Sequence, residues 1–189
     1  MAIRRSGGPP QWKNRAFDLA LVAVLAALTY AAKTALAFLP NVELVSLLLC
    51  VFSAALGVKR GVAIGVLFST LTLLDGIAYG LNDWVFLYYF DWTLLPVLAL
   101  LINRGRNKSL RAAVLTGGFG LFFTLPSYPL KLLMFGKAYL VSYMLADIPF
   151  NIVHGAANFI IGLFLFEPLY NVVDKTYRRI RSSRFERKP

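Results

Sequence analysis

Six apolar stretches separated by short polar or basic segments constrain this chain more than any other feature of its sequence. A helix that crosses a bilayer needs about 20 mainly apolar residues, so six crossings would use about 120 positions. Hydrophobic residues make up 58% of the 189-residue chain and charged residues 15%, a balance too apolar for a soluble domain. This composition excludes a soluble globular enzyme. The stretches span 17–39, 44–57, 61–81, 84–102, 112–134 and 140–169.

The basic residues predict which side of the membrane each connection occupies. The net charge is +11, and 17 of the 20 basic residues fall in four clusters between or outside the apolar stretches. That distribution favours membrane topology over nucleic-acid binding, because cytoplasmic connections carry an excess of Lys and Arg. An even number of spans puts all four clusters on one side. The clusters are Arg4, Arg5, Lys13 and Arg15; Lys59 and Arg60; Arg104, Arg106, Lys108 and Arg111; and Lys175, Arg178, Arg179, Arg181, Arg184, Arg187 and Lys188.

We therefore predict an all-α integral membrane protein, a six-transmembrane-helix bundle with both termini cytoplasmic. The expected parts are a basic tail at 1–16, the six-helix domain at 17–170 and a second basic tail at 171–189. The first stretch could also be read as a secretory signal, because Ala35-Leu36-Ala37 resembles a small-residue cleavage site. We favour a spanning helix, since Lys33 interrupts the end of the run and Pro40 begins a polar turn.

Alanines recur along the first stretch at helical spacing. Steps of three and four residues place them on one face of a helix, and small residues at such intervals let two membrane helices approach closely. The face either packs within the bundle or docks another membrane subunit. The stripe runs through Ala16, Ala20, Ala23, Ala27, Ala31 and Ala35, and the candidate interface residues are Ala20, Ala23, Ala27 and Ala31.

The last stretch carries polar residues at spacings of four, three and four: Asp147, Asn151, His154 and Asn158. They share one helical face. Because polar side chains inside a membrane avoid lipid, this face is expected to point into the helix bundle. The face either forms a hydrogen-bonded seam between helices or lines a ligand cavity. Asp147 and Asn151 lie nearer the outer surface and are candidate ligand contacts, whereas His154 and Asn158 are expected to be structural.

Three further irregularities fall at the same outer level. Residues 79–92 hold seven aromatic residues among acidic ones, and on a helix Trp84, Tyr88 and Asp91 fall on one face. This segment indicates either an interfacial belt or a pocket wall. A Pro-Ser-Tyr-Pro run at 126–129 interrupts the fifth stretch, and broken spans often mark binding sites. A Pro-Asn turn at 40–41 follows the first stretch. The candidate ligand contacts are Asn41, Glu43, Tyr79, Trp84, Tyr88, Asp91, Lys131, Asp147 and Asn151.

The sequence holds few residues suited to catalysis or metal binding. A single cysteine, Cys50, and a single histidine, His154, permit no disulfide and no two-histidine zinc motif. Neither a phosphate-binding P-loop nor a G-x-S-x-G nucleophile motif is present. We expect a non-enzymatic protein without metal or other cofactor. A small intramembrane enzyme that pairs Asp147 with His154, or Asp75 with Asp91, as acid and base is the alternative, and a purely structural membrane subunit is a third.

In their order and spacing, several segments resemble the substrate-binding S-components of energy-coupling factor (ECF) vitamin transporters. They are the alanine-spaced first helix, the Leu-Pro-Asn-Val-Glu turn at 39–43, the turn at 76–84, the run at 147–159 and the Glu-Pro-Leu at 167–169. The turn at 39–43 and the last helix are most similar to the cobalamin-specific group. An outer half with a slight acidic excess suits a large, nearly neutral ligand better than an anionic one. Pantothenate, a pyridoxine-type vitamin or a deazapurine remain alternatives.

The resemblance implies a division of labour. In that family the vitamin binds near the outer surface, beneath the connections between helices one and two, three and four, and five and six. The alanine face of the first helix docks on a transmembrane coupling subunit, and two cytoplasmic ATPase subunits drive the toppling that delivers the ligand inward. The implied partners are therefore these subunits, a vitamin and membrane lipid, and the implied location is the prokaryotic plasma membrane as a multi-pass protein.

Overall fold

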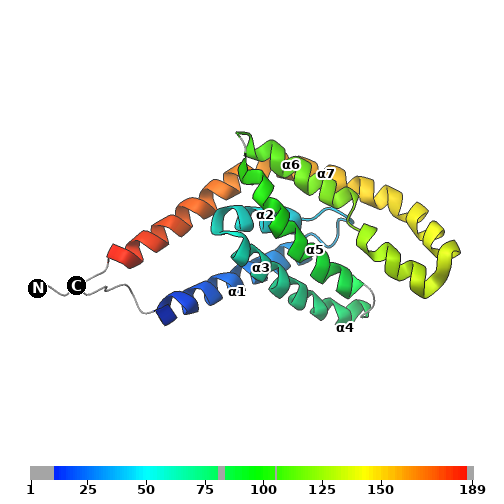
Figure 1. Ribbon diagram of the computed structural model, residues 1–189, viewed down its shortest axis with the longest axis horizontal. Helices are drawn as coiled ribbons and strands as arrows, with labels where there is room; N and C mark the ends of the chain where they lie inside the picture. Colours follow the sequence, from blue (N-terminus) through cyan, green and yellow to red (C-terminus); the bar gives the residue numbers. More distant parts are fainter. Residues whose placement is uncertain (1–10, 81–83, 105, 187–189) are drawn as a thin grey trace, which may run out of the picture.

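The computed structural model describes residues 11–80, 84–104 and 106–186, and within them it contains helices and no strands (Figure 1). The all-α prediction is confirmed. The helices are α1 (Gln11–Ala35), α2 (Val45–Leu56), α3 (Val58–Leu71), α4 (Gly76–Tyr79), α5 (Trp84–Leu98), α6 (Lys108–Leu121) and α7 (Tyr128–Glu186), with 3₁₀ helices η1 (Thr72–Asp75), η2 (Ala99–Arg104) and η3 (Leu125–Ser127).

Three helical stretches in the described part of the chain are long and apolar enough to cross a membrane: Arg15–Ala35, Trp84–Arg104 and Lys108–Ser183. The third contains 76 residues, far more than the roughly 20 that one crossing needs. Helix α2 is apolar but shorter. The six-span count and the side on which the termini lie stay predictions.

Helix α7 consists of two segments that meet at a reversal. Gly136 has φ 79° and ψ 174°, a left-handed conformation that glycine adopts without steric cost. The first segment projects beyond the rest of the molecule, and the chain then returns along α6 (Figure 1). The proline-rich interruption predicted at 126–129 is present, because α6 ends at Leu121 and η3 follows before α7 begins. The helix then continues to Glu186, through most of the segment predicted as a basic tail.

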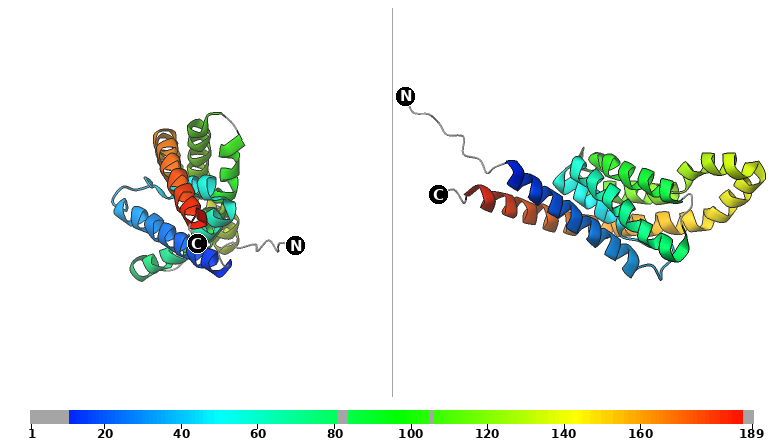
Figure 2. Two further views of the ribbon diagram at one scale, coloured as in Figure 1. Left: turned by 90° about the vertical axis from the view of Figure 1, so that its left-hand side faces the viewer. Right: turned by 90° about the horizontal axis from the view of Figure 1, so that it is seen from below.

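Side-chain contacts join the start of α3 to α1 and α7. Arg60 at the start of α3 pairs with Asp18 of α1 at 3.0 Å, and its guanidinium lies 5.4 Å from the ring centroid of Tyr177 in α7. Asn103 of η2 donates to the backbone oxygen of Ala54 at 3.1 Å. The start of α1 and the end of α7 lie at one end of the molecule (Figure 2, right). The helical part of the chain thus begins and ends at the same end of the molecule.

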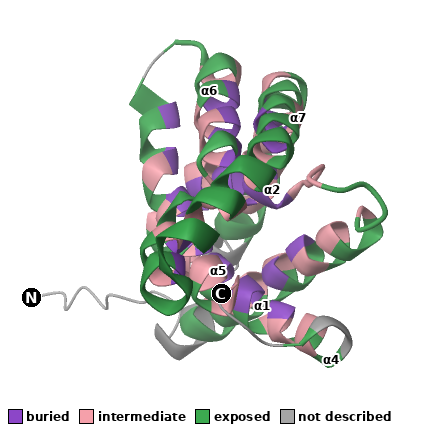
Figure 3. Ribbon diagram, turned by 90° about the vertical axis from the view of Figure 1, so that its right-hand side faces the viewer, coloured by how far each residue is buried: buried purple, intermediate pink, exposed green. Residues whose placement is uncertain are grey.

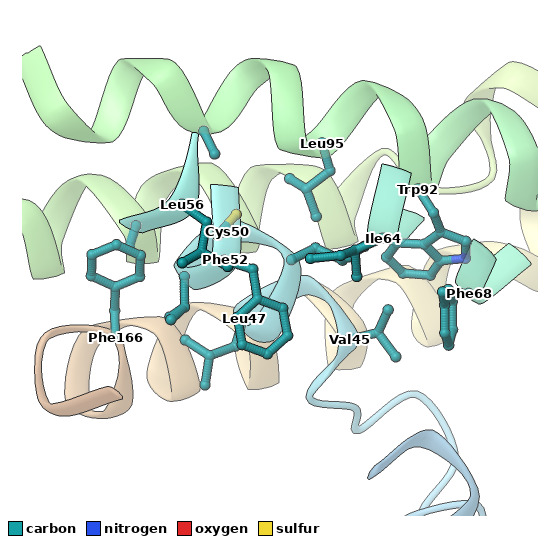
Figure 4. Close-up of a cluster of buried hydrophobic side chains, with 14 of the residues drawn as sticks. Val45, Leu47, Cys50, Phe52, Leu56, Ile64, Phe68, Trp92, Leu95 and Phe166 are labelled. Atoms are coloured by element: carbon teal, nitrogen blue, oxygen red, sulfur yellow. The ribbon is translucent and has the colours of Figure 1, made fainter. Parts of the chain in front are cut away.

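The core is centred on α2, which the other helices surround. Leu47, Cys50 and Phe52 of α2 are buried, and they pack in one cluster with Phe68 of α3 and Trp92 of α5 (Figure 4). Because neighbouring helices cover α2, this helix has little surface to match to lipid, which accounts for a second stretch of only 12 residues.

The outer faces of the helices are exposed and largely apolar (Figure 3). Examples are Leu19 on α1 at 71% exposure and Leu133 on α7 at 84%. Soluble monomers rarely leave large contiguous apolar patches uncovered. This surface is compatible with a membrane protein, in agreement with the long apolar helices.

Glycines allow close helix crossings, and the tightest lies between α3 and α5. A Cβ built on Gly65 would lie 1.9 Å from the backbone oxygen of Trp92, so Gly65→Ala must force the helices apart. We expect this variant to lose at least about 3 kcal/mol of stability, the upper range for overpacking, measured by thermal unfolding in detergent. Gly118→Ala is the control, since its Cβ would meet nothing within 4 Å. Equal melting temperatures for the two variants would contradict this packing.

Candidate functional site

A buried polar seam joins the connection after α1 to α7. The Glu43 carboxylate accepts from the Asn158 side-chain amide at 2.8 Å and from the backbone amide of Ser46 at 2.8 Å. His154 Nε2 lies 3.3 Å from the same carboxylate, and Asn158 also donates to the Ser46 hydroxyl at 3.2 Å. His154, Asn158 and Ser46 are buried. The seam fixes the residues just before α2 against the middle of α7.

The neighbours of Glu43 in the seam affect the pKa of its carboxyl group. Burial raises the pKa of Glu43, but hydrogen bonds from His154 and Ser46 outweigh it and leave that pKa below its ordinary value. Glu43 is therefore ionised at neutral pH. The expectation that His154 and Asn158 are structural agrees with their place in the seam. Glu43, expected to contact a ligand, has its carboxylate engaged by these neighbours.

Aromatic rings continue from the seam toward α5. The Phe123 ring lies 5.2 Å from the His154 ring and 6.1 Å from the Tyr88 ring. Tyr88 in turn lies 5.2 Å from Trp84, at the first turn of α5. Trp92 packs 5.3 Å from Phe123. Centroid distances in this range are those of favourable aromatic pairs, so this aromatic cluster is continuous from the first turn of α5 to the polar seam.

Asp91 does not share the environment of Tyr88, although helical spacing predicted one face for both. Its side chain is 2% exposed and borders an apolar groove of about 440 Å³ between α5 and α6. Its Oδ2 has no hydrogen-bond partner among the described residues. Tyr88 instead packs in the aromatic cluster. The groove is lined by Asp91, Leu94, Leu98, Val114, Leu115, Gly118, Phe119, Phe122, Leu125 and Pro126.

Asn151 of α7 meets the turn between α6 and η3. Its side-chain amide donates to the Thr124 hydroxyl at 2.9 Å. Both residues line a second groove of about 270 Å³, beside Tyr128 and Ile152. Here a polar pair, from α7 and from the turn before η3, lines a groove among apolar side chains.

Lys131 and Asp147 lie nearer the reversal at Gly136. Lys131 is buried, with its ammonium 4.1 Å from the ring centroid of Tyr143, a cation–π geometry. Asp147 is half-buried, and its Oδ2 has no hydrogen-bond partner in the described part of the chain. These residues belong to the projecting pair of helices rather than to the aromatic cluster.

The remaining candidates lie in a connection or at the end of a helix. Asn41 is half-buried with φ 60°, a left-handed conformation that asparagine tolerates better than most residues. Trp84 donates its indole N–H to the backbone oxygen of Gly80 at 3.2 Å. Tyr79 ends α4, and its side chain lies outside the described part of the structure. Lys33 of α1 pairs with Asp75 of η1 at 2.5 Å, which joins the last part of α1 to the segment that follows α3.

The alanine stripe of α1 faces outward. Ala20, Ala23, Ala27 and Ala31 are all exposed, while Ala26 and Thr29 on the other side of the helix are buried. The stripe therefore does not supply the packing of α1 within this chain. Its role as a partner surface stays a prediction.

Sequence reasoning missed several residues that the structure brings to the site. Ser46, Thr116 and Thr124 are short hydroxyl residues inside apolar runs, and Thr116 donates to the backbone oxygen of Asn158 at 2.9 Å. Phe119 and Phe123 complete the aromatic cluster. Their four-residue spacing was a signal, although Phe123 lies in the turn just after α6.

The described residues contain no group of three or more His, Cys, Asp or Glu side chains that could hold a metal ion. Comparisons with protein-family models, curated proteins and solved structures find no match for this chain. A functional proposal therefore rests on the all-α fold, the exposed alanine face of α1, the polar seam and the two grooves.

Proposed function

We propose that this chain is the substrate-binding S-component of an ECF-type importer. It captures a vitamin at the outer membrane face and delivers it inward by toppling, when docked on a transmembrane coupling subunit with two cytoplasmic ATPases. Hydrolysis of ATP then belongs to those partners, in keeping with a sequence that has no P-loop.

The observation that carries this proposal is the exposed alanine stripe. Membrane helices associate through small residues that let their backbones approach, and this stripe is not used inside the chain because Ala20, Ala23, Ala27 and Ala31 are exposed. An exposed face of small residues on an apolar helix is suited to contact a helix of a second membrane subunit. In the ECF family that this chain resembles, the S-component docks its coupling subunit through this face.

The arrangement of the ends supports the proposed topology. Arg60, from the basic turn before α3, contacts Asp18 of α1 and Tyr177 of α7, and the positive-inside rule expects this basic turn on the cytoplasmic side. The reversal at Gly136 lies at the opposite end of the molecule from the start of α1 and the end of α7 (Figure 1). The stretch Lys108–Ser183 then makes an outward and a return pass, which suits an even number of crossings.

The proposed ligand site lies at the end opposite the basic clusters, between Asn41, the aromatic cluster of Trp84 and Tyr88, and the outer part of α7. Cobalamin is the favoured vitamin on the resemblance of the 39–43 turn and the last helix. Pantothenate, a pyridoxine-type vitamin and a deazapurine are the alternatives. An intramembrane enzyme would differ from all of them by turning its ligand over.

Reconstitution tests the proposal directly. The chain in liposomes with a coupling subunit and both ATPases should import radiolabelled cobalamin only when ATP is supplied, and the chain alone should bind the vitamin without moving it. Import by the chain without partners, or conversion of the vitamin into a product, would contradict the proposal. Import of another vitamin would change the assignment of the ligand and keep that of the subunit.

Trp84→Ala is expected to weaken vitamin binding about thirtyfold. Removing a central aromatic at a binding surface costs on the order of 2 kcal/mol, and about 1.4 kcal/mol changes affinity tenfold. Titration calorimetry on the purified variant measures the change. Lys59→Ala, at the basic end, is the matched control and should leave the dissociation constant unchanged. Equal affinity of the two variants would place the ligand away from Trp84.

Cysteine labelling tests the topology. Cys50 is the native cysteine and is buried, so it should stay unlabelled and serve as the background. With a membrane-impermeant maleimide, Ser183→Cys should react only after the cells are opened, because the basic end is expected to be cytoplasmic. Lys137→Cys, beside the reversal, should react in intact cells. The opposite pattern would invert the topology.

A further inference from the structure

The groove between α5 and α6 combines apolar walls with one buried carboxyl group. Leu94 and Leu98 of α5 face Val114 and Phe122 of α6 across it. Asp91 is the one ionisable residue in its lining, and is 2% exposed. Burying a carboxylate without a partner is unfavourable, so this position requires an explanation that packing alone does not give.

One carboxyl oxygen of Asp91, Oδ2, is left without a hydrogen-bond partner in the described part of the chain, residues 11–80, 84–104 and 106–186. By contrast, the half-buried carboxylate of Glu43 has hydrogen bonds or a close contact from Ser46, His154 and Asn158. The fold therefore supplies donors for the Glu43 carboxylate and leaves the more deeply buried Asp91 facing a groove.

We propose that this groove binds a small membrane-dissolved amphiphile that carries a single ammonium group. The apolar body would lie between α5 and α6, and the ammonium would donate to Asp91. Charged hydrogen bonds of this kind are stronger than neutral ones, and the contact would neutralise the buried carboxylate. The proposal does not rest on the proposed function, because it concerns this groove alone.

Two features select the occupant. The volume of about 440 Å³ lies in the range of small-molecule sites and is small for a partner helix. The rim is apolar and exposed at Val114, Phe122 and Leu125, so a molecule can enter laterally from lipid. Asp91 is the one charged group in the lining, so the groove offers a partner to a cation and none to a phosphate. The lining therefore favours a simple amine over a zwitterionic phospholipid.

Photolabelling of the full-length chain in lipid nanodiscs tests the proposal. The probe is dodecylamine with a diazirine in its alkyl chain, and peptide mass spectrometry locates the labelled residues. Labelling is expected on the groove-facing residues of α5 and α6, with competition by unlabelled dodecylamine and not by dodecanol. Equal competition by the two compounds would show an ordinary acyl-chain groove and overturn the proposal.

Two variants probe the site independently. Asp91→Asn keeps the shape of the side chain and should reduce groove labelling about tenfold, the effect of losing one charged hydrogen bond. Gly118→Leu should block the groove by filling it, because a Cβ at Gly118 would meet nothing within 4 Å and the fold can accept it. Asp147→Asn is the control and should label normally.

Each result decides the matter. Labelling that survives both Asp91→Asn and Gly118→Leu, or that spreads equally over exposed residues such as Leu133, would overturn the site. Circular dichroism and thermal unfolding of each variant establish that a loss of labelling is not a loss of fold. If Asp91→Asn alone unfolded the chain, Gly118→Leu with the dodecanol competition would still decide the proposal.

Discussion

Glu43→Ala is expected to lower the free energy of unfolding by about 3–5 kcal/mol, the range for removing one member of a buried charged network. The substitution removes the acceptor shared by Asn158, His154 and the backbone amide of Ser46. Buried donors left without a partner pay their full desolvation cost. Unfolding monitored by circular dichroism in a mild detergent measures the loss.

Two controls sharpen this result. Glu43→Gln retains one acceptor oxygen, so it should lose less stability than Glu43→Ala. Glu167→Ala removes a carboxylate from an exposed position, where it accepts from Ser109 at 3.1 Å, and should change stability by less than about 1 kcal/mol. A Glu43→Ala variant as stable as Glu167→Ala would show that the seam does not hold the connection after α1 to α7.

Ala27→Trp is expected to reduce transport at least about tenfold while leaving vitamin affinity of the isolated chain near normal. A bulky ring on the alanine stripe would hold two helix backbones apart, and contacts between membrane helices depend on their close approach. Because Ala27 is exposed, the larger side chain enters no packed region of this chain. Uptake in the reconstituted complex and calorimetry on the isolated chain measure the two effects.

Ile160→Trp is the matched control, since Ile160 is an exposed apolar residue on α7 away from the stripe. It should alter neither transport nor affinity. Ala27→Trp should also reduce recovery of the coupling subunit when the complex is purified through this chain. Normal transport by Ala27→Trp, or a collapse of its vitamin affinity, would contradict the assignment of the stripe as a docking face.

The apolar stretches predicted the all-α class. The second stretch was expected at 44–57 and α2 spans Val45–Leu56, because an uninterrupted apolar run bounded by a glycine leaves few alternatives. The interruption was predicted at 126–129, whereas α6 already ends at Leu121. The apolar stretches also gave no sign that α7 continues to Glu186, because its last part is charged and does not belong to an apolar run.

The site was predicted less completely, for a reason that concerns pairing. Spacing along α7 placed Asn151, His154 and Asn158 on one face, but it could not show that Glu43, far away in sequence, would be their partner. Spacing along α5 placed Tyr88 and Asp91 together, yet their side chains serve different surroundings. The spacing of residues gives the direction of each side chain around its own helix. It does not show which residues of other helices the side chain contacts, because those contacts depend on tertiary packing.

Native mass spectrometry of the chain purified from cells grown with cobalamin tests the central claim most directly. The account predicts one vitamin bound per chain, released unchanged when the chain is activated in the gas phase. A saturable complex with a different vitamin would reassign the ligand only. A chain that carries no vitamin and binds none on titration, or that releases a chemically altered product, would contradict its identification as a substrate-binding transport subunit.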